Sequence, residues 1–203
     1  MYHTRYYGRF LSLLGLVCLL LFSGCTQDKY QRLYHALPIN MDGNPAGQTV
    51  LVVFLDYSDV NSLKMGPILN ELMEKSPNLR VIYRPMVMHP KQAYASKMVL
   101  AAGLQDRFLA AHHLAINAHP GLSEAALRDL VSQAFVDPKR LQQDLNSPEV
   151  MAALEENKHL AVLWQVNTVP AFLIGRLNQA PVLLVGPQSL KTLMTAVNKE
   201  SAT

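Results

Sequence analysis

Hydrophobic positions divide the first half of the chain into strand and helix signals. Residues 49–55 (Thr-Val-Leu-Val-Val-Phe-Leu) form an uninterrupted apolar, β-branched run, which predicts a strand buried on both faces. Residues 59–75 carry apolar side chains at helical spacing, and residues 79–83 (Leu-Arg-Val-Ile-Tyr) predict a second strand. A strand, a helix and a parallel strand in this order form a βαβ unit, whose crossover should be right-handed.

The second half of the chain changes its pattern twice. From residue 91 to about residue 164 helical periodicity dominates, and turn and capping signals divide it into helices, with Pro138 and Pro148 at first helical positions. Residues 171–174 and 182–185 then predict a hairpin, and residues 188–198 an amphipathic helix. The order βαβ, helical block, ββα predicts an α/β protein with a thioredoxin fold and a helical insertion at about 91–164.

The N-terminal 25 residues are typical of a bacterial export signal. Residues 1–9 are basic, residues 10–22 are almost wholly apolar, and Ser23-Gly24-Cys25 follows. The apolar run is shorter than the ~20 residues of a membrane-spanning helix. Its end resembles a lipobox, which implies cleavage before Cys25 and acylation of the cysteine. An ordinary cleaved signal that happens to contain a cysteine is the alternative.

These signals predict three segments. Residues 1–24 are expected to be a lipoprotein signal peptide, residues 25–46 a lipidated N-terminus and polar tether, and residues 47–203 the folded domain. Acyl chains on Cys25 would anchor the protein in a membrane. Thr26 follows the cysteine, and by resemblance to enterobacterial sorting a residue other than Asp there predicts the periplasmic side of the outer membrane.

Composition supports a packed domain and argues against a nucleic-acid partner. Hydrophobic residues make up 50% of the chain and charged residues 16%. The net charge of +3 comes from 18 basic and 15 acidic residues and includes Arg5 and Arg9 of the expected leader, so the remainder has 16 basic against 15 acidic residues, or +1. No stripe of basic residues with interleaved aromatics is visible.

The cysteine count limits the possible chemistry. The sequence has two cysteines, Cys18 in the expected leader and Cys25, which would become a thioether. The folded domain would then hold no thiol for a disulfide, a thiolate metal site or nucleophilic catalysis.

Three short motifs, in the right order on the predicted elements, resemble the DsbA-like branch of the thioredoxin superfamily. They are Gly43-Asn44-Pro45 before the strand that ends in Asp56-Tyr57, residues 64–71 (Lys-Met-Gly-Pro-Ile-Leu-Asn-Glu), and residues 165–172 (Gln-Val-Asn-Thr-Val-Pro-Ala-Phe). The second is similar to the family's first helix and the third to its cis-proline loop. The resemblance covers about residues 43–198 and places the family's Cys-x-x-Cys on Asp59-Val60-Asn61-Ser62.

The resemblance implies a chemistry whose key atoms are missing here. The family attacks disulfides with a thiolate at a helix N-terminus, where the helix dipole activates it, and a second cysteine resolves the mixed disulfide. Asp59 replaces the attacking cysteine and Ser62 the resolving one. A serine hydroxyl is far less acidic than a thiol, so no catalytic residue is predicted. We expect Asp59 to be a helix N-cap, with a ligand contact as the alternative.

Val169 and Pro170 leave two interpretations open. The resemblance implies a cis peptide bond before Pro170 and backbone groups of residue 169 that face an extended substrate peptide. The loop is either a fold-determining turn or, together with the 59–62 segment, part of a peptide groove.

Other candidate clusters carry weaker signals. His112 and His113 are adjacent, so their side chains point ~100° apart on a helix and form no chelating face. We expect surface or partly buried histidines, and predict no metal and no cofactor. Asp56 and Asp59 could form a carboxylate pair, but no third group accompanies them. Trp164 is expected to be a packing residue, and Met86 and Met88 to share one strand face as part of the core.

The sequence therefore favours a redox-inactive, DsbA-like envelope lipoprotein with a binding, scaffold or chaperone-like role. Its expected partners are a membrane, through the lipid on Cys25, and a protein or extended peptide. Two alternatives remain: a thiol-disulfide oxidoreductase-family protein that works with a cysteine-bearing partner, and a different enzyme that uses Asp59 and Ser62.

Overall fold

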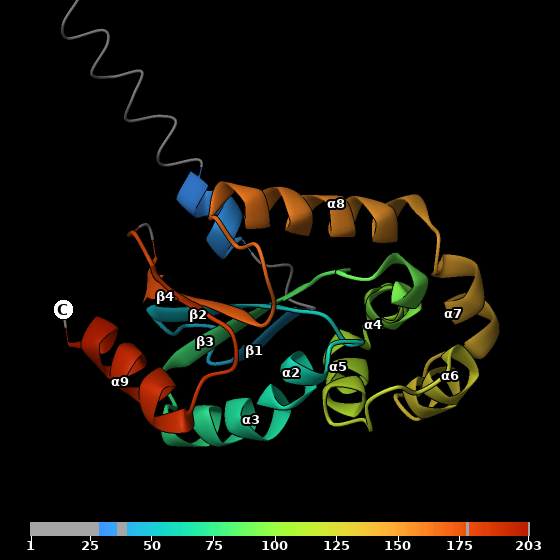
Figure 1. The fold of residues 1–203 in the computed structure, drawn as a ribbon, viewed down its shortest axis with the longest axis horizontal. Coiled ribbons are helices and arrows are strands. Elements are labelled where there is room, and N and C mark those ends of the chain that lie inside the picture. The colour runs from blue at the N-terminus through green and yellow to red at the C-terminus, as the bar shows by residue number, and fades with distance from the viewer. Residues whose placement is uncertain (1–28, 36–39, 178, 203) are drawn as a thin grey trace, which may run out of the picture.

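A five-stranded mixed sheet forms the centre of the protein, seen in a computed structural model that describes residues 29–35, 40–177 and 179–202 (Figure 1). The strand order is β1-β3-β2-β4-β5. The strands are β1 (Met41–Gly43), β2 (Thr49–Leu55), β3 (Leu79–Pro85), β4 (Ala171–Arg176) and β5 (Val182–Val185). β2 and β3 are parallel, and the other neighbouring strands are antiparallel.

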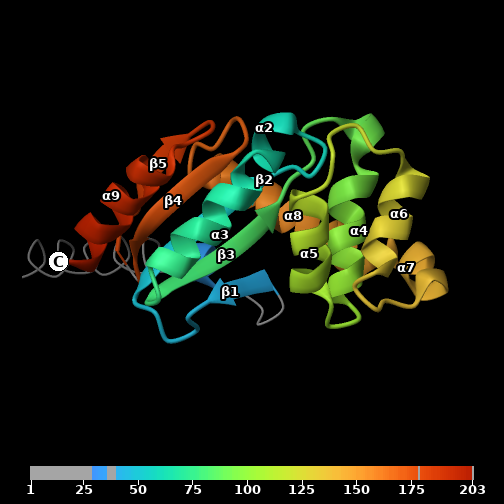
Figure 2. The same ribbon diagram turned by 90° about the horizontal axis from the view of Figure 1, so that it is seen from below.

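Helices cover both faces of this sheet and form a block beyond one of its ends. They are α2 (Val60–Leu63), α3 (Met65–Lys75), the 3₁₀ turn η2 (Pro90–Gln92), α4 (Tyr94–Gly103), α5 (Phe108–Ile116), α6 (Glu124–Ser132), α7 (Pro138–Asp144), α8 (Pro148–Leu163) and α9 (Leu190–Ser201). α4 to α7 lie together beside the sheet, and α3 and α9 cover the face opposite α8 (Figures 1 and 2). The chain thus has a thioredoxin fold with a helical insertion, which confirms the predicted fold.

β2 is the central strand, and all of its residues are buried, as its apolar run predicts. Leu51, Val53 and Leu55 belong to the core beneath α3, α9 and the helical block. Val50, Val52 and Phe54 point to the other face, where α8 packs. Because side chains alternate along a strand, one apolar run supplies both cores.

The helix predicted over residues 59–75 is interrupted at Lys64. α2 ends at Leu63 and α3 begins at Met65. Pro67 has no N–H to donate to the carbonyl of Leu63, four residues earlier, so the proline weakens the helix at this point. Ser123, Asp137 and Ser147 are the N-caps of α6, α7 and α8, because each side chain accepts a hydrogen bond from a first-turn amide of its helix.

The segment expected to be a tether is partly folded into the domain. Residues 29–34 are helical, and Leu33 is completely buried against the α8 face of the sheet. β1 pairs with β3, with Met41 opposite Ile82. The folded part therefore begins well before residue 47; a three-residue strand and one turn or two of helix are too short to give a periodic signal.

The predicted leader, Cys18, Cys25 and Thr26 lie outside the described residues. Within the described part of the chain, no helix combines the length and apolar character that crossing a bilayer requires.

Candidate functional site

The chain leaves β2 at a buried carboxylate. Asp56 is 1% exposed and accepts hydrogen bonds from Ser58 N (2.8 Å), Ser58 Oγ (2.6 Å) and Met88 N (2.7 Å). A buried carboxylate needs such donors because it has lost its water. Asp56 thereby ties the end of β2 to the segment that follows β3.

Asp59 is the N-cap of α2. Its backbone is extended (φ −89°, ψ 122°), and its Oδ2 accepts from Ser62 N at 2.7 Å and from Ser62 Oγ at 2.9 Å. The carboxylate satisfies one of the free amides of the first turn and also lies at the positive end of the helix dipole. The predicted capping role of Asp59 is confirmed.

Ser62 is completely buried and links the two aspartates. Its hydroxyl donates to Asp59 and accepts from the backbone N–H of Asp56 at 3.2 Å. A hydroxyl that is buried and already bonded on both sides has no room for a substrate. This geometry argues against an enzyme that uses Ser62 as a nucleophile with Asp59 or Asp56.

The loop before β4 reaches the same end of the sheet. Ala171 is paired with Phe54, so Pro170 lies level with the end of β2, where the 56–62 segment begins. The peptide bond between Val169 and Pro170 is cis, as the resemblance implies. The Pro170 carbonyl accepts from Gly186 N at 2.8 Å, and the Val169 side chain is buried. The four residues of the 59–62 segment and this loop thus share one end of the sheet.

A hollow of about 250 Å³ borders the 59–62 segment. It lies between the α2–α3 segment and the connection from α5 to α6, and it is lined by Val60, Leu63, Lys64, Pro67, Ile116, Asn117, Ala118 and Pro120. Val60 is 43% exposed at the start of α2. An apolar hollow beside an exposed valine can accept an apolar side chain of a bound polypeptide.

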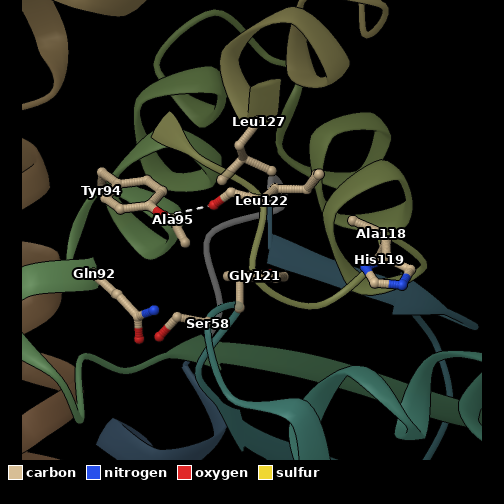
Figure 3. A pocket seen from close by; sticks show the side chains of 10 residues that line it. Ser58, Gln92, Tyr94, Ala95, Ala118, His119, Gly121, Leu122 and Leu127 are labelled. Atoms are coloured by element: carbon tan, nitrogen blue, oxygen red, sulfur yellow. Dashed lines mark hydrogen bonds between the residues drawn. The ribbon is translucent and has the colours of Figure 1, made fainter. Parts of the chain in front are cut away.

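A second, much smaller cavity lies where Ser58 meets the helical block (Figure 3). Tyr94 Oη donates to the Leu122 carbonyl at 2.7 Å and closes one side of it. Its volume of about 20 Å³ suits a single water rather than a ligand.

The two adjacent histidines have different partners, although their rings meet edge to face with centroids 5.2 Å apart. His112 is 1% exposed; its Nδ1 lies 2.7 Å from Tyr57 Oη and its ring is stacked on Tyr83 with centroids 3.7 Å apart. Burial lowers the pKa of His112 to about 3, so the ring is neutral and Tyr57 donates to it. His113 instead pairs with Asp42 of β1 at 3.2 Å, and this hydrogen bond lowers the pKa of Asp42.

Sequence reasoning missed the burial of His112, although a signal was present. Phe108, Ala111, Ala115 and Ile116 mark the buried side of α5, and position 112 lies on that side. Among the described residues, no group of three or more His, Cys, Asp or Glu side chains is arranged so that it could hold a metal ion.

Two further sequence expectations have separate outcomes. Met86 and Met88 do not share a strand face, because β3 ends at Pro85; Met86 is buried, whereas Met88 is 37% exposed. Trp164 does pack, with its ring centroid 5.6 Å from that of Tyr30.

A thioredoxin-type sheet, a helical insertion, and a cis-proline level with the first helix together define a DsbA-like thioredoxin protein. The family described as the DSBA-like thioredoxin domain matches residues 50–198, and the chain belongs to this family. No curated protein sequence matches significantly.

Solved structures share the fold over nearly their whole length. A thioredoxin-like oxidoreductase from Silicibacter pomeroyi DSS-3 is 24% identical with a TM-score of 0.76, covering 85% of this chain and 98% of its own. The catalytic domain of Proteus mirabilis ScsC is 23% identical (TM-score 0.73; 87% and 96% covered). A periplasmic thioredoxin-like protein from Salmonella enterica serovar Typhimurium is 23% identical (TM-score 0.69; 86% and 97% covered).

Proposed function

We propose that this protein is a DsbA-like envelope protein that does not exchange disulfides and instead binds extended polypeptide at the 59–62 segment. The observation that carries the proposal is the hydrogen-bonded Asp59–Ser62 pair at the start of α2. It stands where the family's sequence pattern has its two cysteines. The pair retains a negative charge at the helix terminus and offers no sulfur for a mixed disulfide.

The surroundings of this pair support binding. Pro170 lies at the same end of the sheet, Val60 is exposed, and the 250 Å³ hollow begins at Val60 and Leu63. An extended chain that passes Val169 and Pro170 would meet the 59–62 segment and could place an apolar side chain in the hollow. A scaffold or chaperone-like role would use this surface without chemistry.

The envelope location and the anchor belong to the same proposal. Cys25 would carry the lipid, and Thr26 favours the periplasmic side of the outer membrane. One structural relative is described as periplasmic, which is consistent with an envelope location.

The binding test uses the lipidated full chain and a permanently unfolded probe protein whose cysteines are carboxymethylated. Asn61→Trp introduces a bulky side chain on half-buried α2, and Glu74→Trp introduces the same group on the exposed end of α3 as the control. We expect Asn61→Trp to weaken probe binding and Glu74→Trp to leave it unchanged. Equal binding by both variants would show that the 59–62 segment is not the binding surface.

Family membership favours one alternative, a thiol-disulfide oxidoreductase that works with a cysteine-bearing partner. An insulin-reduction assay on the purified lipidated protein separates the two. Turnover above the uncatalysed rate by the protein alone contradicts the redox-inactive proposal. Turnover that appears only with a partner from its own envelope supports the alternative.

A further inference from the structure

The N-terminal helix is fastened to the domain rather than held by a tether. Arg84 of β3 is 7% exposed, and its Nη2 lies 3.0, 2.9 and 2.5 Å from the carbonyl oxygens of Arg32, Leu33 and His35. These carbonyls end the 29–34 helix, whose negative dipole end stabilises the guanidinium. Burial lowers the pKa of Arg84 only to about 10, so it remains charged at neutral pH.

Two further contacts fix the direction of this helix. Arg32 forms a bidentate pair with Glu156 of α8, with Nη2–Oε2 at 2.7 Å and Nε–Oε1 at 3.3 Å. Tyr34 donates to the Gln179 carbonyl at 3.0 Å, and its hydroxyl lies 2.8 Å from the position that a Cβ on Gly175 would occupy. The helix is thereby held against β3, β4 and α8 at once (Figure 1).

The surface around this helix combines the half-buried rings of Tyr30 and Trp164 with exposed side chains of α8. Lys29 Nζ lies 3.9 Å above the ring of Trp164, which also packs on Tyr30. Val162, two residues before Trp164, is 71% exposed. One turn earlier the Lys158 side chain is 68% exposed and pairs with Glu155 at 3.6 Å. Aromatic rings, an exposed valine and lysines are the groups that suit the headgroup region of a bilayer. We call this set, Lys29, Tyr30, Lys158, Val162 and Trp164, the α8-end surface.

The short stretch of chain between Cys25 and Lys29 limits how far this surface can lie from a membrane that holds the Cys25 lipid. Only residues 26–28 separate Cys25 from Lys29. A fully extended chain spans at most about 14 Å over that interval. An acylated Cys25 would lie at headgroup level, so Lys29 and its neighbours could not be far from the lipids.

We propose that the α8-end surface lies against the membrane leaflet that holds the Cys25 lipid, and that the domain is docked there in one orientation. This inference rests on the lipid anchor proposed above. α3 and α9 cover the opposite face of the sheet, so they point away from the membrane.

The test uses lipidated full chain in vesicles of phosphatidylethanolamine with a minority of phosphatidylglycerol. Acylated Cys25 and the removal of Cys18 with the leader leave an introduced cysteine as the single labelling site. An environment-sensitive fluorophore is attached to Val162→Cys, and to Lys75→Cys on α3 as the control, where the lysine side chain is 48% exposed. Lipids with a nitroxide on the headgroup serve as quencher. Intact mass records the acyl chains, and the single tryptophan, Trp164, reports on the unlabelled protein.

We expect the label at position 162 and Trp164 to lose about half of their emission or more, as headgroup-level groups should, and the label at position 75 to lose none. Equal quenching at positions 162 and 75 in an acylated protein overturns the docked orientation and leaves the anchor intact. A mass without acyl chains overturns the anchor and this inference together, while peptide binding at the 59–62 segment would still stand.

Discussion

Asp59 and Ser62 are joined twice, since Asp59 Oδ2 accepts from the Ser62 backbone N–H at 2.7 Å and from the Ser62 hydroxyl at 2.9 Å. The second bond links two side chains three residues apart at the start of a helix. Under the register proposed above, these positions correspond to the two cysteines of the family's pattern. The hydrogen bond from the Ser62 hydroxyl to the Asp59 carboxylate would then stand in place of a covalent link that could open and close.

The cap makes Asp59 a stability residue. Asp59→Ala removes the acceptor for the Ser62 amide and hydroxyl and should lower the free energy of unfolding by about 1–2 kcal/mol. Asp59→Asn retains an N-cap acceptor and should cost less. Chemical denaturation of the three proteins measures the difference. Wild-type stability in Asp59→Ala would show that the cap contributes nothing.

The proposed register can be tested by restoring sulfur. Asp59→Cys with Ser62→Cys should form an intramolecular disulfide under mild oxidation, because the side chains at these positions already meet. Mass spectrometry with and without a thiol-alkylating reagent gives the result. Asp59→Cys alone is the matched control, and its thiol should still react with the alkylating reagent after oxidation. If the double variant also alkylates fully after oxidation, the two positions do not correspond to a Cys-x-x-Cys.

The sequence predicted a helix or strand well where its hydrophobic pattern was long, and poorly where the element was short. The 49–55 strand was predictable because every one of its residues is buried, so no polar position interrupts the pattern. β1 has three residues with a mixed pattern, and its place in the sheet depends on pairing with β3 rather than on its own composition. Pairing across the fold leaves no local signal.

The candidate site shows the same division. The cap at Asp59 is a local feature and could be predicted, because an N-cap acts within one helical turn. The contacts from Asp56 to Met88 and from Tyr57 to His112 join segments that are 32 and 55 residues apart. The packing of the whole fold decides which residues of two distant segments meet. The local sequence of either segment does not contain this information.

His112 should make the stability of the protein depend on pH. Its pKa is about 3 in the folded protein, where burial lowers it, against 6.5 for an ordinary histidine. Between these values the unfolded chain binds a proton that the folded protein does not. The free energy of unfolding should therefore be highest above pH 6.5 and fall as the pH drops, with a slope of up to about 1.4 kcal/mol per pH unit from this group.

The measurement compares wild type with His112→Asn from pH 6.5 to 5, where ordinary carboxyl groups are still largely ionised. His112→Asn should be less stable at pH 7 because Tyr57 loses its partner and a cavity opens. Its pH slope should nevertheless be smaller than that of wild type. His119→Asn, at an exposed position, is the control and should keep the wild-type slope. The same slope in all three proteins would contradict a neutral, buried His112.

Arg84 should decide whether the N-terminal helix stays on the domain. Its guanidinium holds three carbonyl groups at the end of that helix, and hydrogen bonds to charged groups contribute about 1.5–3 kcal/mol each at most. Arg84→Met retains most of the apolar stem and removes the donors. We expect the helix to detach, so trypsin should cleave after Lys29 and Arg32 at a much lower protease concentration than in wild type. Arg107→Met, at an exposed position before α5, removes the same charge elsewhere and should not change the cleavage. The opposite result would point to Leu33, which is completely buried. If the burial of Leu33 alone holds the helix, Arg84→Met will lower the free energy of unfolding without earlier cleavage. The direction of the chain toward Cys25 would then depend on apolar packing rather than on Arg84.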